Sequence, residues 1–191
     1  MSMSVEQFLS LSDAEQLQTI KDLNDIGQED IIIDVLTGVG IDKLSAPLLG
    51  ELGRAYNNND KPEEAIKVFK AIDKKYRDAV WHYRCAYSYG SIVSSNREAY
   101  TSENMQQMLA LLDSGVQLAT KENRNDVREY CFEVMDMCRL QMDFEKCEVD
   151  YPDLCLNYSK YIAEKKKKRE GVPRQRTITV EEILATDDMW T

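Results

Sequence analysis

The sequence predicts an all-α fold. Apolar residues recur at helical spacing almost throughout the 191 residues, which places them on one face of each helix. No convincing run alternates apolar with polar residues over the length of a strand. Glycines, prolines and short polar turns interrupt the pattern, so several helices of ordinary length are expected.

The first two expected helices lie near the N-terminus. One begins at Ser12, whose hydroxyl can cap the backbone while Glu15 reaches back from three residues further on. Gly27 is expected to end it. A shorter helix over residues 30–36 is closed by the turn at residues 38–40, because the two glycines there adopt positive φ at little steric cost.

The clearest helical pattern begins at Ser45. The helix that follows it runs into an asparagine-rich turn at residues 57–60. Pro62 then lies in the first turn of a second helix, where a missing N–H costs nothing, and Asp60 or Lys61 can cap that helix. The expected buried faces of this pair are Leu48, Leu49, Leu52, Ala55 and Tyr56, then Ala65, Ile66, Val68, Phe69 and Ile72.

The next pair of helices is less regular. A helix from about Ala79 is dense in aromatic residues, which suggests burial on more than one side. The polar residues 94–104 then make a connection that is longer than a tight turn. A helix over about residues 102–120 follows, with its apolar side chains on one side.

The C-terminal part is expected to contain two long helices and a tail. The first runs from Asp126, as its cap, to about Gln141, and Pro152 separates it from a second helix over residues 153–168. Residues 171–191 are expected to be a tail. Its apolar residues indicate that it docks, either over the chain's own groove or on a second copy.

The segment from residue 48 to 72 carries a diagnostic spacing. Leu52-Gly53, Tyr56, Ala65 and Phe69 occupy its key positions. Small residues at 53 and 65 let two antiparallel helices approach closely, while the aromatic rings fill the space beyond that contact. In this spacing the segment resembles a tetratricopeptide repeat (TPR).

A second, poorer copy follows at an offset of about 34 residues. Cys85-Ala86 replaces the Leu-Gly pair, Tyr89 takes the place of the tyrosine, and Trp81 stands near the start, as a tryptophan does in the family. The polar insertion at residues 94–104 delays the second helix of this copy and departs from the family's pattern.

The resemblance implies a fold and a domain organisation. Antiparallel helix pairs are expected to stack as a short, right-handed, TPR-like solenoid with capping helices. Residues 1–170 would form this single domain, with the tail at residues 171–191. The best repeat spans residues 46–78, the poorer repeat spans 79–119, and the capping helices span 126–168.

Proteins of the family usually bind extended peptides on the concave surface formed by the first helix of each pair. By that analogy, the arginines here could hold a carboxylate bidentately and the tyrosines could supply stiff contact area. An equally open alternative is that the tyrosines pack on neighbouring helices and Arg54 pairs with a local glutamate. The expected peptide-binding residues are Arg54, Asn57, Asn58, Tyr83, Arg84 and Tyr87.

The sequence contains few residues or motifs that are suited to catalysis or metal binding. His82 is the only histidine, which removes most general-base and zinc arrangements. The five cysteines include no Cys-x-x-Cys pair, so reduced and mostly buried thiols are expected. No phosphate-binding Gly-Lys-Ser/Thr loop or Gly-x-Ser-x-Gly elbow occurs. No catalytic residue, cofactor or metal is therefore expected, and the chain is not expected to be an enzyme.

The charge of the chain narrows the class of partner. A formal net charge of -10 disfavours nucleic acid, because neutralising phosphates requires clustered Lys and Arg. Basic peptides or basic protein patches are better matched. No signal peptide or apolar run of about 20 residues is recognisable, so no membrane association and a cytoplasmic location are expected.

The function that these observations favour is that of an adaptor or scaffold for protein–protein interaction. A chaperone-like or immunity-type accessory protein is an alternative. From another class, an enzyme or small-ligand binder could use Tyr130, Glu133 or Asp136 in a site among residues 105–168. A homo-oligomer formed through the C-terminal tail is a further possibility.

Overall fold

The computed structural model describes residues 3–95 and 103–170. Contacts divide the chain into two compact units, residues 1–158 and 159–191. The described residues form α-helices and short 3-10 turns with no strand, so the predicted all-α class is confirmed. In the second unit, the described residues are the C-terminal part of the last helix.

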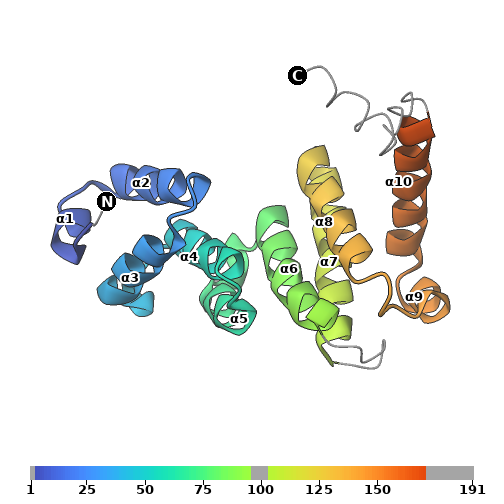
Figure 1. The fold of residues 1–191 in the computed structure, drawn as a ribbon, viewed down its shortest axis with the longest axis horizontal. Coiled ribbons are helices and arrows are strands. Elements are labelled where there is room, and N and C mark those ends of the chain that lie inside the picture. Colours follow the sequence, from blue (N-terminus) through green and yellow to red (C-terminus); the bar gives the residue numbers. More distant parts are fainter. Residues whose placement is uncertain (1–2, 96–102, 171–191) are drawn as a thin grey trace, which may run out of the picture. The chain divides into compact units, whose positions relative to one another are not determined.

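Figure 1 shows the helices in chain order. Their bounds are α1 Val5–Leu9, α2 Asp13–Asp25, α3 Glu29–Val39, α4 Ala46–Asn58, α5 Pro62–Ala71, α6 Ala79–Ser95, α7 Glu103–Lys121, α8 Asn125–Met137, α9 Phe144–Asp150 and α10 Pro152–Glu170.

Local sequence signals explain where α2 to α5 begin and end. The backbone N–H of Ser12 donates to Glu15 Oε2 at 2.9 Å, as the predicted capping box requires. Gly27 follows α2 with a φ of 71°. Pro62 is the first residue of α5, where it replaces no helical donor. The predicted helices from Ser12, Ser45 and Pro62 are thus confirmed.

Several predicted boundaries were wrong. Gly38 lies inside α3, which continues to Val39, and Gly40 ends it with a φ of 99°. Asp126 lies in the first turn of α8 rather than at its cap. The predicted helix to Gln141 stops at Met137. Two short helices were not predicted, α1 and α9.

The expected apolar faces of α4 and α5 form the core between these helices. All the expected residues are buried except Tyr56, which is half-buried. The closest approach is at Gly53, where an added Cβ would lie 2.5 Å from Cζ of the fully buried Phe69. Only glycine leaves room for that ring. The predicted contact of Gly53 with Ala65 stays a prediction.

A constant sequence interval relates the first helices of the N-terminal pairs. The residues that precede α2, α4 and α6 are Ser12, Ser45 and Asp78, which are equally spaced along the chain. Gly27 and Asp60, which follow α2 and α4, have positive φ values of 71° and 51° and are separated by the same interval. The predicted start of the best repeat at residue 46 stays a prediction.

Equivalent hydrogen bonds between these helices recur at the same sequence interval. Asn24 Nδ2 donates to the carbonyl oxygen of Glu51 at 3.2 Å, and Asn57 Nδ2 donates to the carbonyl oxygen of Arg84 at 3.1 Å. Asn24 and Asn57 are separated by the same number of residues as Glu51 and Arg84. Helix α2 therefore meets α4 in the same register in which α4 meets α6.

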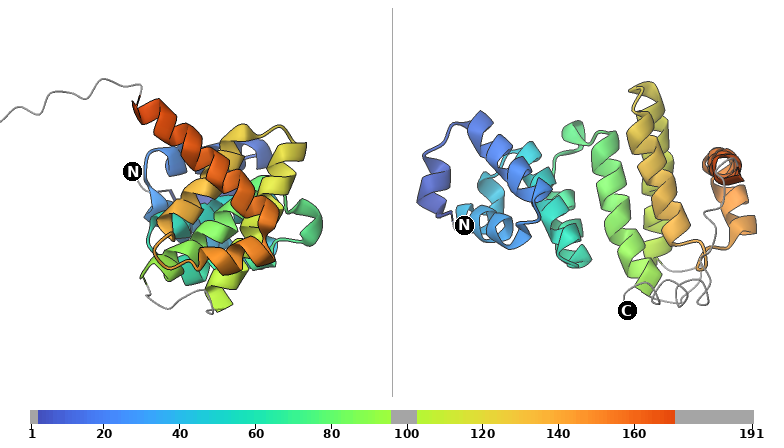
Figure 2. Two further views of the ribbon diagram at one scale, coloured as in Figure 1. Left: turned by 90° about the vertical axis from the view of Figure 1, so that its right-hand side faces the viewer. Right: turned by 45° about the horizontal axis from the view of Figure 1, so that its top comes forward.

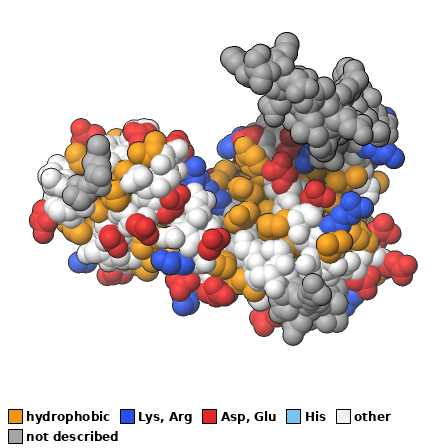
Figure 3. Space-filling view, in the orientation of Figure 1, with side chains coloured by type: hydrophobic (Ala, Val, Ile, Leu, Met, Phe, Trp, Pro, Cys, Tyr) orange, Lys and Arg blue, Asp and Glu red, His pale blue; other side chains and the backbone are white. Residues whose placement is uncertain are grey.

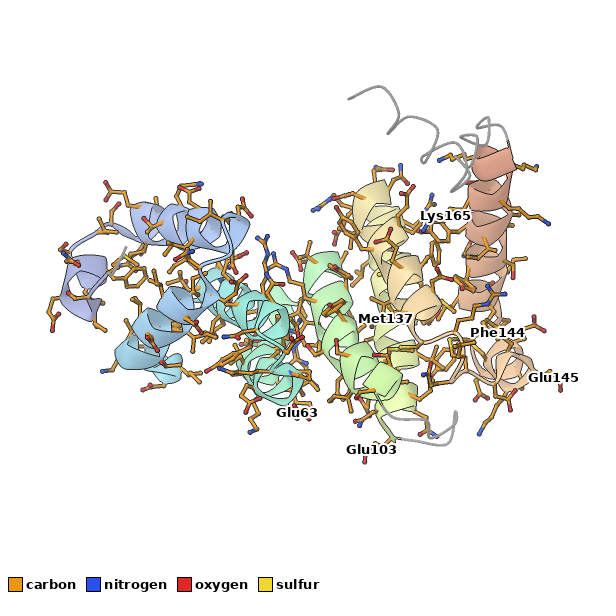
Figure 4. The ribbon with its side chains drawn as sticks, in the orientation of Figure 1. Glu63, Glu103, Met137, Phe144, Glu145 and Lys165 are labelled. Atoms are coloured by element: carbon orange, nitrogen blue, oxygen red, sulfur yellow. The ribbon has the colours of Figure 1, made fainter. Side chains whose placement is uncertain are left out.

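The first helix of each successive pair contacts the next such helix. In this way α2 contacts α4, α4 contacts α6, and α6 contacts α8, while each helix from α2 to α8 also contacts its neighbour in sequence. Figure 2 shows α6, α7 and α8 side by side. Gly90 permits the approach of α8 to α6, since an added Cβ would lie 2.8 Å from Cε of Met137 (Figure 4).

Across residues 3–95 and 103–170, none of the helices has the length and apolar character needed to span a membrane. The expected cytoplasmic location stays a prediction. The tail at residues 171–191 lies outside the described residues.

Candidate functional site

A cavity of about 370 Å³ lies between α4, α6 and α8. All the residues predicted to bind a peptide line it, and α8 adds one residue that was not predicted for this site. The lining residues are Arg54, Asn57, Asn58, Tyr83, Arg84, Tyr87 and Tyr130.

The two arginines of the cavity are held by the chain's own carboxylates. Arg84 Nη1 lies 3.0 Å from Glu51 Oε1, and Arg54 Nη1 lies 3.6 Å from Glu51 Oε2. Arg54 Nη2 also contacts Asp25 Oδ1 at 2.9 Å. Glu51 is only 5% exposed, so the pairing is largely shielded from solvent. The alternative in which Arg54 pairs with a local glutamate is the arrangement observed.

The two asparagines of the cavity have different surroundings. Asn57 is buried, and its Oδ1 accepts a hydrogen bond from Ser88 Oγ at 2.7 Å in addition to the bond that Nδ2 donates to α6. Asn58 is exposed, and its Nδ2 donates to Glu29 Oε1 at 3.2 Å. Asn57 therefore fixes the packing of α4 on α6, whereas Asn58 presents a polar side chain at the surface.

Tyrosines form the wall of the cavity on the side of α6 and α8. The rings of Tyr83 and Tyr130 stack with centroids 5.3 Å apart and planes inclined by 30°. Burial raises the pKa of the Tyr83 hydroxyl, and the nearby Tyr87 adds to the effect. Tyr130 is 44% exposed, although it is a large aromatic side chain. The Tyr83 hydroxyl therefore stays protonated at neutral pH and can donate a hydrogen bond.

A second cavity, of about 440 Å³, adjoins the first. Arg84 lines both cavities, and we call the two cavities together the groove. The second cavity is mostly apolar, with Pro47 of α4 and Trp81 of α6 among its lining residues. Figure 3 shows Lys and Arg side chains beside a hydrophobic patch where α2, α4 and α6 come together.

Trp81 gives the second cavity a fixed wall. Its indole Nε1 donates to the carbonyl oxygen of Phe69 at 2.9 Å, and the guanidinium of Arg77 lies 4.5 Å from its ring centroid. The same phenylalanine fills the space at Gly53. Trp81 is therefore anchored to Phe69, which packs against Gly53 in the preceding helix pair, α4 and α5.

Two of the residues proposed for an enzymatic alternative have different neighbours. Tyr130 lines the first cavity, while Asp136 Oδ1 accepts a hydrogen bond from the Tyr158 hydroxyl at 3.1 Å. His82 is half-buried, and its Nδ1 lies 2.8 Å from the carbonyl oxygen of Asp78. Among the described residues, no group of three or more His, Cys, Asp or Glu side chains could hold a metal ion.

The five cysteines are all buried free thiols. Burial raises the pKa of Cys85, Cys131 and Cys138 to about 12, so these thiols are protonated at neutral pH. The expectation of reduced, buried cysteines agrees with this arrangement.

Sequence reasoning missed three features of the groove. The second cavity was not predicted, although Pro47 and Val80 occupy equivalent positions in successive repeats. Nothing in the sequence indicated that Glu51 would lie between two arginines. Tyr130 was predicted for another site, because the insertion after α6 breaks the interval that would have aligned α8 with α4 and α6.

Comparison with known proteins adds no relative: no family model, no curated protein and no solved structure matches the chain.

Proposed function

We propose that the chain is an adaptor or scaffold that holds an extended segment of another protein in the groove along α4, α6 and α8. The observation that carries this proposal is the convergence of the predicted peptide-binding residues on one cavity. Its volume of about 370 Å³ lies within the range of ligand pockets, about 300–1,000 Å³. The adjoining cavity lengthens the groove, as an extended segment requires.

We also propose that the pairs α2–α3, α4–α5 and α6–α7 stack as a TPR-like solenoid, with α8 to α10 as capping helices. The repeated register of Asn24 and Asn57 supports this arrangement. So do the contacts between successive first helices. In a solenoid of this kind, the first helices line one continuous surface, which is where repeat proteins bind extended partners.

The groove favours a segment that binds through apolar and aromatic side chains. The guanidinium groups of Arg54 and Arg84 already engage Glu51 and Asp25, so a ligand carboxylate would have to compete with internal ones. The tyrosine wall is open to stacking contacts. Asn58 at the rim can bond a peptide backbone.

A peptide-library selection tests the proposal. Peptides displayed on phage would be selected on the folded protein, and their affinity measured by fluorescence anisotropy. Tyr130→Ala and Tyr87→Ala should each weaken binding about 10-fold, equivalent to about 1.4 kcal/mol, because each removes aromatic contact area from the wall.

The matched control is Leu140→Ala, which removes a side chain that is 97% exposed and lies outside both cavities. It should leave the affinity unchanged. Failure to select any peptide, or selected peptides that bind the tyrosine variants as tightly as the original protein, would contradict the proposal. A thermal-shift screen with metabolites distinguishes the small-ligand alternative, which predicts a raised melting temperature.

A further inference from the structure

Two cysteines of the first unit lie in direct contact. The Sγ atoms of Cys147 in α9 and Cys155 in α10 are 2.7 Å apart. Cys147 is 0% exposed and Cys155 is 3% exposed. A disulfide bond is about 2.0 Å long, so a small closing movement would bring these sulfur atoms to bonding distance.

The backbone between the two helices places these thiols together. The N–H of Tyr151 donates to the carbonyl oxygen of Cys147 at 2.8 Å, and the N–H of Cys155 donates to the carbonyl oxygen of Tyr151 at 3.1 Å. Tyr151 therefore takes part in two backbone hydrogen bonds, each between residues with the spacing of an α-helix. The chain nevertheless changes direction at Tyr151, before Pro152. These bonds bring the side chains of the two cysteines, which are eight residues apart, into contact.

Aromatic stacking holds the same two elements together. The ring of Phe144, at the start of α9 (Figure 4), stacks on Tyr158 of α10 with centroids 6.1 Å apart. Tyr158 in turn lies 6.3 Å from Phe132 of α8. The thiol contact is thus part of a packed junction rather than a chance meeting of mobile side chains.

The other cysteine pair in this region lacks such geometry. Cys131 and Cys138 are separated by seven residues along α8 and its cap, a rise of about 10 Å in an α-helix. Cysteines whose Cα atoms are more than about 7 Å apart cannot be joined without backbone movement. Cys138 instead donates its S–H to the carbonyl oxygen of Gly90 at 3.3 Å.

We propose that Cys147 and Cys155 form an oxidisable dithiol, a modification site at which hydrogen peroxide generates a disulfide bond between α9 and α10. In the first step, one cysteine sulfur attacks a peroxide oxygen and the O–O bond breaks. That sulfur becomes a sulfenic acid, and the hydroxide that leaves takes up a proton. In the second step, the other sulfur attacks the sulfenic sulfur, the S–O bond breaks, and a second water leaves with the remaining thiol proton. The two thiols lose two electrons, which reduce one peroxide to two waters.

Burial limits the reaction in the closed structure. It raises the pKa of both thiols, so little thiolate is present to attack the peroxide. Local opening of α9, which has only seven residues, gives peroxide access to the pair.

Peptide mapping after oxidation tests the proposal within one molecule. The native full chain is treated with hydrogen peroxide, quenched in acid, alkylated under denaturing conditions and digested with trypsin. Cleavage after Lys146 and Lys160 places Cys147 and Cys155 in one peptide, residues 147–160. Cleavage after Arg128 and Arg139 places Cys131 and Cys138 in another, residues 129–139, which serves as the internal control.

The expected result is that peptide 147–160 carries no alkyl group and weighs two hydrogen atoms less than its unalkylated dithiol form, reversibly with dithiothreitol, while peptide 129–139 carries both alkyl groups. Cys147→Ser should stop the reaction at a sulfenic acid on Cys155 that dimedone traps. Cys138→Ser, whose hydroxyl can still donate to Gly90, should leave the disulfide intact. Persistent alkylation of peptide 147–160, equal oxidation of both peptides, or a disulfide between chains would overturn the proposal.

Discussion

Replacing Gly53 by alanine should destabilise the chain, although alanine is the better helix former. An alanine Cβ would lie 2.5 Å and 2.6 Å from Cζ and Cε1 of Phe69, about 1 Å inside ordinary carbon–carbon contact. The Phe69 ring is fully buried, and its carbonyl oxygen holds the Trp81 indole, so the ring has little room to retreat.

Gly50 is the matched control, because it lies in the same helix about one turn earlier. The nearest atom to an added Cβ there is Arg84 Nη1 at 3.8 Å, an ordinary contact. Gly→Ala in a helix is worth up to about 1 kcal/mol in favour of folding. Overpacking a core costs about 1–3 kcal/mol. The propensity gain is common to both variants, so Gly53→Ala should be less stable than Gly50→Ala by about 1–3 kcal/mol.

Urea denaturation followed by circular dichroism measures both free energies of unfolding on one scale. A difference of about 1–3 kcal/mol corresponds to about 2–12 °C in melting temperature for a chain of this size. Phe69→Leu should relieve the clash, so in a double-mutant cycle the double variant should be less destabilised than the sum of the two single variants. Equal stability of the two alanine variants would refute the close packing of Gly53 against Phe69.

Three further outcomes are expected. Asn57→Ala should lower the free energy of unfolding by about 1–3 kcal/mol, because it removes two hydrogen bonds of a buried side chain. Asn58→Ala, at an exposed side chain, should change it by less than about 0.5 kcal/mol; urea titration measures both. Glu51→Ala should cost about 2 kcal/mol by the same assay, since it removes the buried carboxylate that Arg54 and Arg84 share. Burial, together with the charge of Asp153, raises the pKa of Asp113, so the folded state binds its proton more tightly than the unfolded state does. The contribution of Asp113 to stability is therefore greatest at low pH and falls as pH rises through the folded pKa. Asp113→Asn should raise the melting temperature at pH 7, and the gain should disappear below about pH 4.

The sequence predicted best those helices whose ends carry strong local signals. Ser12 with Glu15, the asparagine-rich turn before Pro62, and the apolar faces of α4 and α5 each act within a few residues of the chain, so spacing alone located them. The end of α8 could not be found in this way, because neither Gly nor Pro marks it.

The candidate site was predictable to the extent that it follows from the repeat. The interval that relates Ser12, Ser45 and Asp78 also relates α4 to α6, and the residues chosen on those helices line one cavity. The pairing of Glu51 with two arginines depends on the rotation of α4 against α6, which spacing does not specify to the accuracy of a hydrogen bond. Tyr130 reaches the cavity only because α8 packs on α6, beyond the insertion.

Titration of a selected peptide into the ¹⁵N-labelled protein, followed by amide NMR shifts, tests the binding groove most directly. The account predicts that the largest shift changes fall on α4, α6 and α8, around Asn58, Tyr87 and Tyr130, and that Tyr130→Ala weakens them at equal peptide concentration. Shift changes centred on α1 to α3 or on α9, with the groove residues unmoved, would contradict it.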